Sequence, residues 1–424
     1  MPYAYEVPKG GTRQLRRWHK ARVLDILCKE PGLSRSDLAR HLELSPSAVT
    51  EIVAELLEEG LLLECPLPPQ GQGRPSIALE VEGERNLVLA WEIDVDRMAV
   101  ALMSLMGEVR AKVLLPPAPR HPKEALDLLV EATGPLIKGK RLLAAAVTVP
   151  GLLEPEEGHL TLAPNLGWKD LPFGQMVREA LAELGLEGLP LAVENEANAA
   201  AYGLYAWGKW EVDHCLYLNL GVGVGGGVVV DRRVYHGARF HAGEVGHIPL
   251  DPDGPPCGCG KRGCAEVFLS YRRWQEGASE ELLKEMSERL AHLCAIALST
   301  LDPGLVVLGG PLAEAAGEKL LEEVRKRLPR YALKVHEPDQ VVLSPFGRDA
   351  ALLGAGALAA GAGSTRRTAG LGAGLATGLG PTVGRLGGWL VGRGGAVGRG
   401  GTTAGGGAET GLGVSGTVYV GFGA

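Results

Sequence analysis

The sequence contains no long uncharged apolar segment and no large excess of charge of either sign. No run of about 18 apolar residues, the length that a membrane-spanning helix needs, occurs in it, and no apolar segment near the start resembles a signal peptide. The net charge of the 424 residues is −7, which excludes a polycation that binds nucleic acid over its whole surface. We therefore expect a cytoplasmic, multidomain protein in which any DNA contact is local.

The cysteines are few and show no disulfide framework. Four of the seven, Cys28, Cys65, Cys215 and Cys294, are scattered in apolar surroundings, which is typical of reduced and buried thiols. The other three lie within residues 241–266, which also contain His247. This segment therefore carries the most specific chemical pattern in the chain.

The spacing of these three cysteines predicts a structural zinc site. Cys257 and Cys259 are followed by Cys264, and His247 lies ten residues before the first of them. Three thiolates and one imidazole form a tetrahedral Zn²⁺ site, and a metal can hold a loop rich in glycine and proline that buries few apolar side chains. The alternatives are free thiols or a disulfide, although cysteines two residues apart bridge poorly.

Two carboxylates flank this loop. Glu244 and Glu266, together with the second ring nitrogen of His247, could hydrogen-bond the hydroxyls of a small polyol. Solvated surface carboxylates explain the same residues equally well.

The segment resembles a signature of the ROK family of repressors and sugar kinases. Gly243-Glu244-x-Gly246-His247 is followed by a C-x-C-G-x-x-G-C-x-E pattern that ends at Glu266. The resemblance extends over residues 12–360. It implies that His247, Cys257, Cys259 and Cys264 bind zinc, and that Glu244, His247 and Glu266 surround a sugar.

Residues 1–82 predict a winged helix-turn-helix. A basic helix is followed by a break at Pro31-Gly32, a short helix that Ser34 caps, and a third helix that Ser45 and Pro46 begin. Two short apolar segments then flank a tip of glycine, proline and Arg74, as in a hairpin wing. A three-helix module that binds other proteins is the alternative.

The predicted DNA contacts come from three places. Ser47 and Thr50 lie on the exposed face of the third helix, where they could meet base edges in the major groove. Arg74 at the wing tip could enter a minor groove. The third helix has no lysine or arginine, so phosphate contacts are expected from the wing and from four cations of the first helix. These are Arg13, Arg16, Arg17 and Lys20.

The body has an α/β pattern that occurs twice. Each copy begins with strands in a meander and continues with alternating helices and strands, as in the two-lobed actin-like (ribonuclease H-like) ROK body. We expect the first lobe at residues 83–196, with a helix at 345–360 returning to it, and the second lobe with the zinc loop at 197–344.

Residues 361–424 are rich in glycine, which predicts a disordered tail. The alternative is that the tail functions as a weak cationic tether.

The first phosphate site of a ROK kinase is degraded in this sequence. These kinases have Asp-x-Gly-Gly-Thr in the first hairpin, whereas this chain has Asp94-Val95-Asp96-Arg97-Met98. The glycines that would let backbone amides approach a phosphate are missing, and Asp96 adds a negative charge. The glycines at 221–227 could form the second phosphate site or a plain hairpin, and 308–311 resembles the adenosine-site turn, which we interpret as a structural connection.

The sugar side of the pattern is retained. Pro164-Asn165-Leu166-Gly167-Trp168 resembles the family's P-N-L-x-W, and 193–198 resembles V-E-N-D-A-N, which implies that Asn165 and Asn195 contact sugar hydroxyls. Glu196 stands where a kinase has its catalytic aspartate, and a glutamate at this position is similar to xylose-responsive repressors. The alternatives are turn and helix-cap asparagines and a solvated glutamate.

Together these features predict a repressor that binds operator DNA as a homodimer or tetramer and responds to a monosaccharide: xylose first, with glucose and N-acetylhexosamines open. An ATP-dependent sugar kinase of the glucokinase type is the alternative, and a zinc protein without a sugar ligand is a third. In the leading hypothesis there is no catalytic residue, zinc is structural, and the sugar contacts are Asn165, Asn195, Glu196, Glu244, His247 and Glu266.

Overall fold

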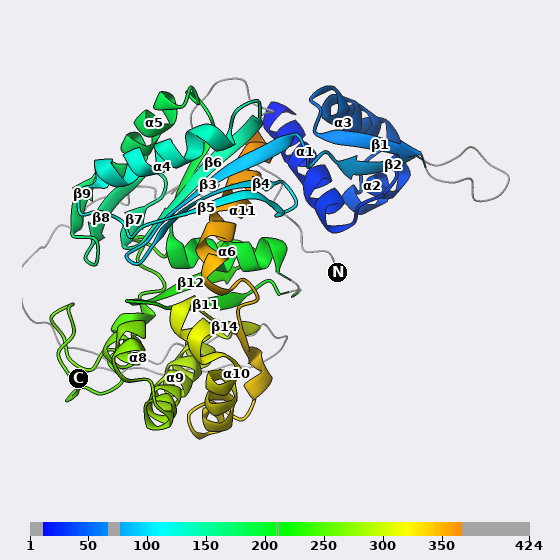
Figure 1. Cartoon of the computed structure of the whole chain (residues 1–424). Coiled ribbons are helices and arrows are strands. Elements are labelled where there is room, and N and C mark those ends of the chain that lie inside the picture. The colour runs from blue at the N-terminus through cyan, green and yellow to red at the C-terminus, as the bar shows by residue number, and fades with distance from the viewer. Residues whose placement is uncertain (1–11, 67–76, 209, 211, 367–424) are drawn as a thin grey trace, which may run out of the picture. The chain divides into compact units, whose positions relative to one another are not determined.

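The computed structural model describes residues 12–66, 77–208, 210 and 212–366 (Figure 1). The wing tip with Arg74 and the segment after residue 366 lie outside this part of the chain. No helix among the described residues is long and apolar enough to cross a membrane.

The winged helix-turn-helix predicted for the start of the chain is confirmed. Its elements are α1 (Thr12–Lys29), α2 (Arg35–Leu42), α3 (Pro46–Glu58), β1 (Leu62–Pro66) and β2 (Ile77–Val81). Ser34 and Asp37 form the capping box of α2, and Ser45 caps α3 by accepting a hydrogen bond from the backbone N–H of Ala48. The caps start both helices where the sequence predicts, because each side chain satisfies a backbone donor that the helix leaves free.

The body contains two five-stranded sheets with the same strand order. The first has β5 (Val109–Leu115), β4 (Met98–Ser104), β3 (Asn86–Ile93), β6 (Arg141–Val149) and β10 (Leu191–Asn195), in that spatial order. The second has β13 (Arg233–Val234), β12 (Val224–Val230), β11 (Cys215–Leu220), β14 (Leu305–Gly309) and β15 (Val341–Leu343). In both, an antiparallel meander leads into two parallel strands, which confirms the duplicated actin-like body.

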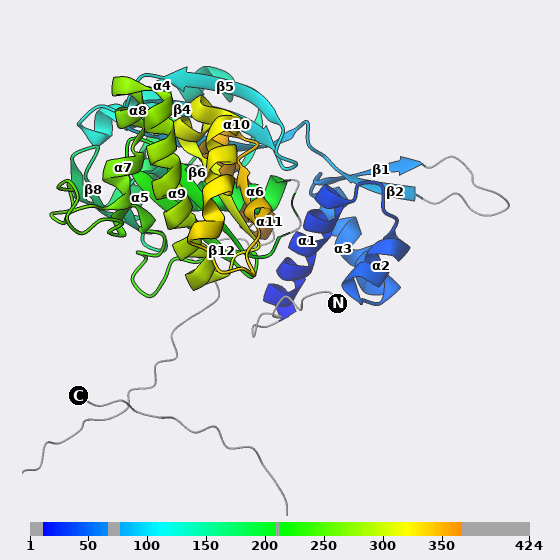
Figure 2. The same ribbon diagram turned by 90° about the horizontal axis from the view of Figure 1, so that it is seen from below.

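Helices cover both sheets. On the first sheet α4 (Pro122–Leu136) packs against α5 (Phe173–Glu183) on one face, and α11 (Ala350–Arg366) covers the other. The second sheet carries α6 (Glu196–Trp207) on one face, while α9 (Glu280–Leu301) and α10 (Gly310–Arg327) lie side by side on the other (Figure 2). Hence α11 does return to the first lobe, as the sequence predicts for the helix at its end.

The remaining elements lie near the ends of the strands. A three-stranded sheet of β7 (Leu152–Glu154), β8 (His159–Ala163) and β9 (Trp168–Leu171) follows β6, and the sequence pattern did not predict it. The short elements after β13 are η1 (Val245–His247), α7 (Ala265–Leu269) and α8 (Tyr271–Gly277), and those near β15 are η2 (Leu328–Arg330), η3 (Pro338–Gln340) and η4 (Gly347–Asp349).

Helices α6 and α11 cross at a pair of glycines between the two sheets (Figure 1). A Cβ on Gly354 would lie 1.9 Å from the carbonyl oxygen of Ala199, and one on Gly203 would lie 2.8 Å from the Cα of Gly354. The absence of side chains therefore lets the two backbones touch. This contact sets the position of α6 relative to the first sheet.

Helix α11 extends into the segment that the sequence predicts to be disordered. The predicted tail begins at Gly361, but the helix continues to Arg366. The added residues 361–366 include two glycines, a serine and a threonine, so they continue the helix that precedes them although their own helix propensity is low. The prediction for residues 367–424 concerns residues outside the described part of the chain.

Replacing Gly354 by alanine should destabilise the protein. The added methyl group has no space against Ala199, so we expect the free energy of unfolding to fall by about 1–3 kcal/mol, measured by chemical denaturation. Gly277→Ala is the matched control, because a Cβ there meets no atom within 4 Å. Equal stability of the two variants would contradict the close helix crossing.

Candidate functional site

Four side chains with metal-binding atoms converge beside β12. The ligand atoms of His247, Cys257, Cys259 and Cys264 all lie within 4.8 Å of one another. The Sγ atoms of Cys259 and Cys264 are 3.6 Å apart, and Nδ1 of His247 is 3.8 Å from Sγ of Cys257. Thiolates and an imidazole that meet at this spacing fit a tetrahedral metal site. The structure thus brings together all four residues that the sequence predicts.

The same histidine faces a carboxylate with its other nitrogen. Nε2 of His247 lies 3.9 Å from an oxygen of Glu244, which begins η1. Nδ1 points to the thiols, and Nε2 points to Glu244. The sequence predicts that His247 takes part in both the metal site and the sugar site, and this orientation leaves one ring nitrogen for each.

A strand of glycines forms the floor between the predicted sugar contacts. A Cβ on Gly223 would lie 2.9 Å from Oε2 of Glu266 and 3.3 Å from Nδ2 of Asn165, and one on Gly225 would lie 3.8 Å from Oε1 of Glu196. The backbone N–H of Val224 donates to Glu266 over 3.1 Å. The missing side chains leave room between these polar groups. The glycine segment thus lies at the turn of the β11–β12 hairpin, beside the predicted sugar contacts.

Asn195 acts as the N-cap of α6. Its Oδ1 accepts from the backbone N–H groups of Ala197 (2.8 Å) and Asn198 (3.2 Å), and its Nδ2 donates to Glu196 (2.8 Å) and to the carbonyl of Gly151 (3.1 Å). The helix-cap alternative therefore describes Asn195 in this structure. The amide still holds Glu196 at the start of the helix, so it contributes to the geometry of the site.

Glu196 belongs to a group of acids that extends toward the first sheet. Burial raises its pKa well above the ordinary value, and the charges of Asp94, Glu244 and Glu92 raise it further. Burial also raises the pKa of Glu92 to about 8 and that of Asp94 to about 6. A region that already disfavours its own carboxylates is a poor binding place for a nucleotide's phosphates.

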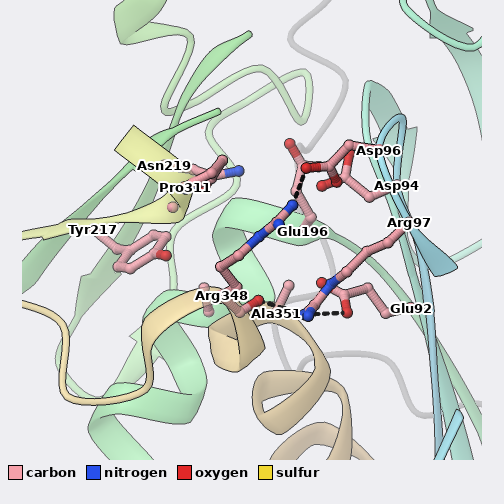
Figure 3. Close-up of a pocket in the computed structure, with 12 residues that line it drawn as sticks. Glu92, Asp94, Asp96, Arg97, Glu196, Tyr217, Asn219, Pro311, Arg348 and Ala351 are labelled. Atoms are coloured by element: carbon pink, nitrogen blue, oxygen red, sulfur yellow. Dashed lines mark hydrogen bonds and ion pairs between the residues drawn. The ribbon is translucent and has the colours of Figure 1, made fainter. Parts of the chain in front are cut away.

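Two arginines pair with this acidic group (Figure 3). Nη2 of Arg97 lies 2.9 Å from Glu92 and 3.1 Å from Asp349, and it donates to the carbonyl of Arg348 over 2.6 Å. The guanidinium of Arg348 in turn binds Asp96. These contacts join the turn between β3 and β4, which is the degraded first phosphate site, to the segment that enters α11.

Little space remains between these side chains. The cavity lined by the acids, the two arginines, Tyr217 and the start of α10 has a volume of about 20 Å³, which holds about one water molecule. The turn at 308–311 leads from β14 into α10, and Gly309 has no room for a Cβ because Tyr217 would lie 2.2 Å from it. The chain's own side chains therefore fill most of this space.

In the head, two predicted DNA contacts have partners within the protein. Lys20 is 4% exposed, and its ammonium pairs with Glu55 (2.5 Å) and Glu59 (2.6 Å). Arg16 pairs with Glu51 (3.0 Å) and Glu55 (2.5 Å). The burial of Lys20 corrects the prediction of a phosphate contact, because α3 carries acids that attract the cations of α1.

The other predicted DNA contacts remain on the surface or outside the described side chains. Ser47 and Thr50 are exposed on α3, and the hydroxyl of Thr50 donates to the carbonyl of Pro46 over 2.8 Å. Arg13 and Arg17 lie in α1. Their side chains, like Arg74, fall outside the described part of the protein.

The sequence prediction missed three features of the site. Arg348 lies far along the chain from its partner Asp96, so no local pattern links the two. The glycines at 223 and 225 matched a phosphate site or a plain hairpin, and neither interpretation predicted that they lie beside Glu266, Asn165 and Glu196. His236 binds the buried Glu194 over 2.7 Å, and only its proximity to the cysteine segment could have drawn attention to it.

The chain belongs to the ROK family. The family model matches residues 88–275 and 271–362, and a model of winged helix-turn-helix DNA-binding domains matches residues 20–62. The xylose repressor of Caldicellulosiruptor bescii is 30% identical over 270 residues, which are 62% of this chain and 66% of that repressor. The chain thus spans slightly less than two thirds of that relative's length.

Solved structures have the same fold. A ROK family transcriptional regulator, described as a homologue of the Escherichia coli Mlc protein, matches 84% of this chain and 99% of its own with a TM-score of 0.69 at 24% identity. The ROK hexokinase of Thermus thermophilus matches 64% of this chain and 97% of its own with a TM-score of 0.53 at 30% identity. The first match includes the head, whereas the second covers a smaller part of the chain.

The buried Glu92 should make the stability depend on pH. Its pKa is about 8 in the folded chain and near 4.5 when exposed, so the folded state holds a proton that the unfolded state releases, and stability falls as the pH rises through this interval. We expect Glu92→Gln to lose less thermal stability than the wild type between about pH 5 and about pH 8. Glu84→Gln, at an exposed side chain, is the control; the same slope in all three proteins would contradict the burial of this charge.

Proposed function

We propose that the protein is a sugar-responsive transcriptional repressor. Its winged helix-turn-helix would bind operator DNA, as two heads of a homodimer or of a tetramer, and a monosaccharide in the cleft between the lobes would change that binding. The observation that carries the proposal is that Arg97 and Arg348 pair with acids where a kinase holds phosphate, while the predicted sugar contacts stay together beside them.

The proposed sugar contacts surround the glycine floor. Asn165, Glu266 and Glu196 approach it, and Glu244 and His247 lie at the same end of the loop that carries the cysteines. Asn195 would act by holding Glu196 through its hydrogen bond. A sugar would contact the amide of Asn195 directly by displacing one of the hydrogen bonds that this amide makes in the protein. Xylose is the first candidate because the xylose repressor relative is similar over the body, and glucose and N-acetylhexosamines are the next ones to test.

The proposed zinc ion is structural. His247, Cys257, Cys259 and Cys264 would hold it, and it would fix the loop between Glu244 and Glu266. Both carboxylates would then be held on a rigid support, which is what a site for a small neutral ligand needs.

The proposed DNA contacts use the exposed parts of the head. Ser47 and Thr50 would meet base edges, and Arg13, Arg17 and Arg74 would contact phosphates or a minor groove. Arg16 would serve mainly to neutralise Glu51 and Glu55, so that α3 can approach DNA.

A sugar kinase is the second candidate, because the hexokinase structure shares the fold. Against it stand the missing glycines of the first phosphate turn, the small volume of the cavity beside it and the winged head. Glu196 in place of aspartate would also shift the base relative to the sugar hydroxyl, which affects catalysis more than binding.

Gel retardation with the DNA upstream of the protein's own gene tests the function. We expect retardation without sugar and at least about ten-fold weaker binding with the effective sugar, which requires about 1.4 kcal/mol of differential sugar binding between the two states.

A coupled assay with ATP and the same sugars should show no turnover. Phosphorylation at an ordinary enzymatic rate, about 1–10³ s⁻¹, would refute the repressor proposal in favour of the kinase.

The zinc site is tested by Cys259→Ser. This cysteine is exposed, so its loss removes a ligand without disturbing a packed core. We expect about one zinc per chain in the wild type and much less in the variant, measured by elemental analysis, with a lower melting temperature. Cys65→Ser, outside the cluster, should keep its zinc; an unchanged content in Cys259→Ser would contradict the proposed ligand set.

A further inference from the structure

One buried carboxylate joins two elements that carry proposed sugar contacts. Glu194 lies on β10 and its side chain is 6% exposed. Its Oε1 accepts from the backbone N–H of Asn195 (2.9 Å) and from Nδ2 of Asn198 (3.1 Å), both at the start of α6. Its Oε2 lies 2.7 Å from Nε2 of His236, on the loop that leads to Glu244. The two oxygens thus hold different parts of the site.

The loop from residue 235 to residue 243 is attached at both ends. At its start His236 binds Glu194 through its ring, and its carbonyl accepts from the N–H of Ala242 over 3.0 Å. At its end Gly243 has a φ of 91° and lies so close to β12 that a Cβ would be 1.9 Å from the carbonyl of Gly226. Glu244 follows at once, so the contact of His236 helps to set where this carboxylate lies.

The surroundings of His236 favour its charged form. Burial lowers its pKa, but the hydrogen bond and the charge of Glu194 on β10, and the charge of Glu156 in the turn between β7 and β8, raise it by more. From its own loop the ring of Phe240 packs edge-on at 6.1 Å, which adds no charge. The imidazolium is thus the form that the pair with Glu194 stabilises.

We propose that His236 is a positioning residue of the sugar site, which as an imidazolium bound to Glu194 holds Glu244 in register with Asn195 and Glu196. This rests on the proposed sugar binding. Because the folded-state pKa is raised, the ion pair is complete below the ordinary pKa of histidine, near 6.5, and its charge-assisted part is lost as the pH rises through the higher folded value. Sugar affinity should therefore decrease toward alkaline pH.

Calorimetric titration of the full-length, zinc-loaded protein with xylose, glucose and N-acetylglucosamine tests the proposal. The titrations are made at about pH 6 and about pH 9. We expect the sugar affinity of the wild type to be about ten-fold lower at the higher pH. His236→Gln should bind weakly at both values, whereas His236→Lys, which stays charged, should bind alike at both. His214→Gln is the matched control, because His214 is 47% exposed and faces Asp231 in the turn between β12 and β13.

Hydrogen exchange of the peptide that covers residues 235–244, measured without sugar, separates the two proposals. Faster exchange in His236→Gln with unchanged zinc content supports the attachment of the loop. Equal sugar affinities and pH profiles in the wild type and His236→Gln would overturn the role of His236 while the sugar function stands. If no sugar binds but exchange is faster in the variant, the attachment stands and the sugar function fails; if no sugar binds and exchange is equal, both fail.

Discussion

The contact between α6 and α11 is the constraint on which the cleft depends. Gly203 and Gly354 bring the two helix backbones together, so the helix that covers the second sheet is fixed against the helix that covers the first. The start of α6 carries Asn195 and Glu196, and the start of α11 follows Arg348 and Asp349. A shift at this crossing would move the polar groups at both helix starts at the same time, because packed helices move as rigid elements.

Around this crossing the molecule separates two kinds of polar site. In one, Arg97 pairs with Glu92 and Asp349, and Arg348 pairs with Asp96, so that both arginines are held by side chains of the chain itself. In the other, Glu196, Glu244 and Glu266 have amide, imidazole or backbone N–H partners, and no lysine or arginine of the described residues pairs with them. An internally paired charge cluster is stable without a ligand, whereas open hydrogen-bonding groups are best satisfied by one. The proposed change from kinase to sensor follows from this difference.

In the winged head, the local sequence pattern predicts the helices but not the ion pairs between them. The caps at Ser34 and Ser45 and the apolar spacing of α3 depend on residues three or four apart, so they predict the helices correctly. The cysteine spacing likewise predicts which atoms converge, because a short loop limits where its thiols can lie. Lys20 was misplaced because its environment depends on Glu55 and Glu59, on another helix, and a basic helix looks the same in sequence whether its cations meet solvent or acids.

The sequence by itself determined the winged head, the duplicated α/β body, the cluster of one histidine and three cysteines, and the absence of glycines from the first phosphate turn, since each depends on residues close together in the chain. Only the tertiary structure decided that Arg348 pairs with Asp96 in the first turn, that Gly223 and Gly225 lie beside Glu266, Asn165 and Glu196, and that His236 meets Glu194. These contacts join segments from different lobes or from opposite ends of the body. Their existence depends on how the sheets and helices pack, which no periodicity within one segment encodes.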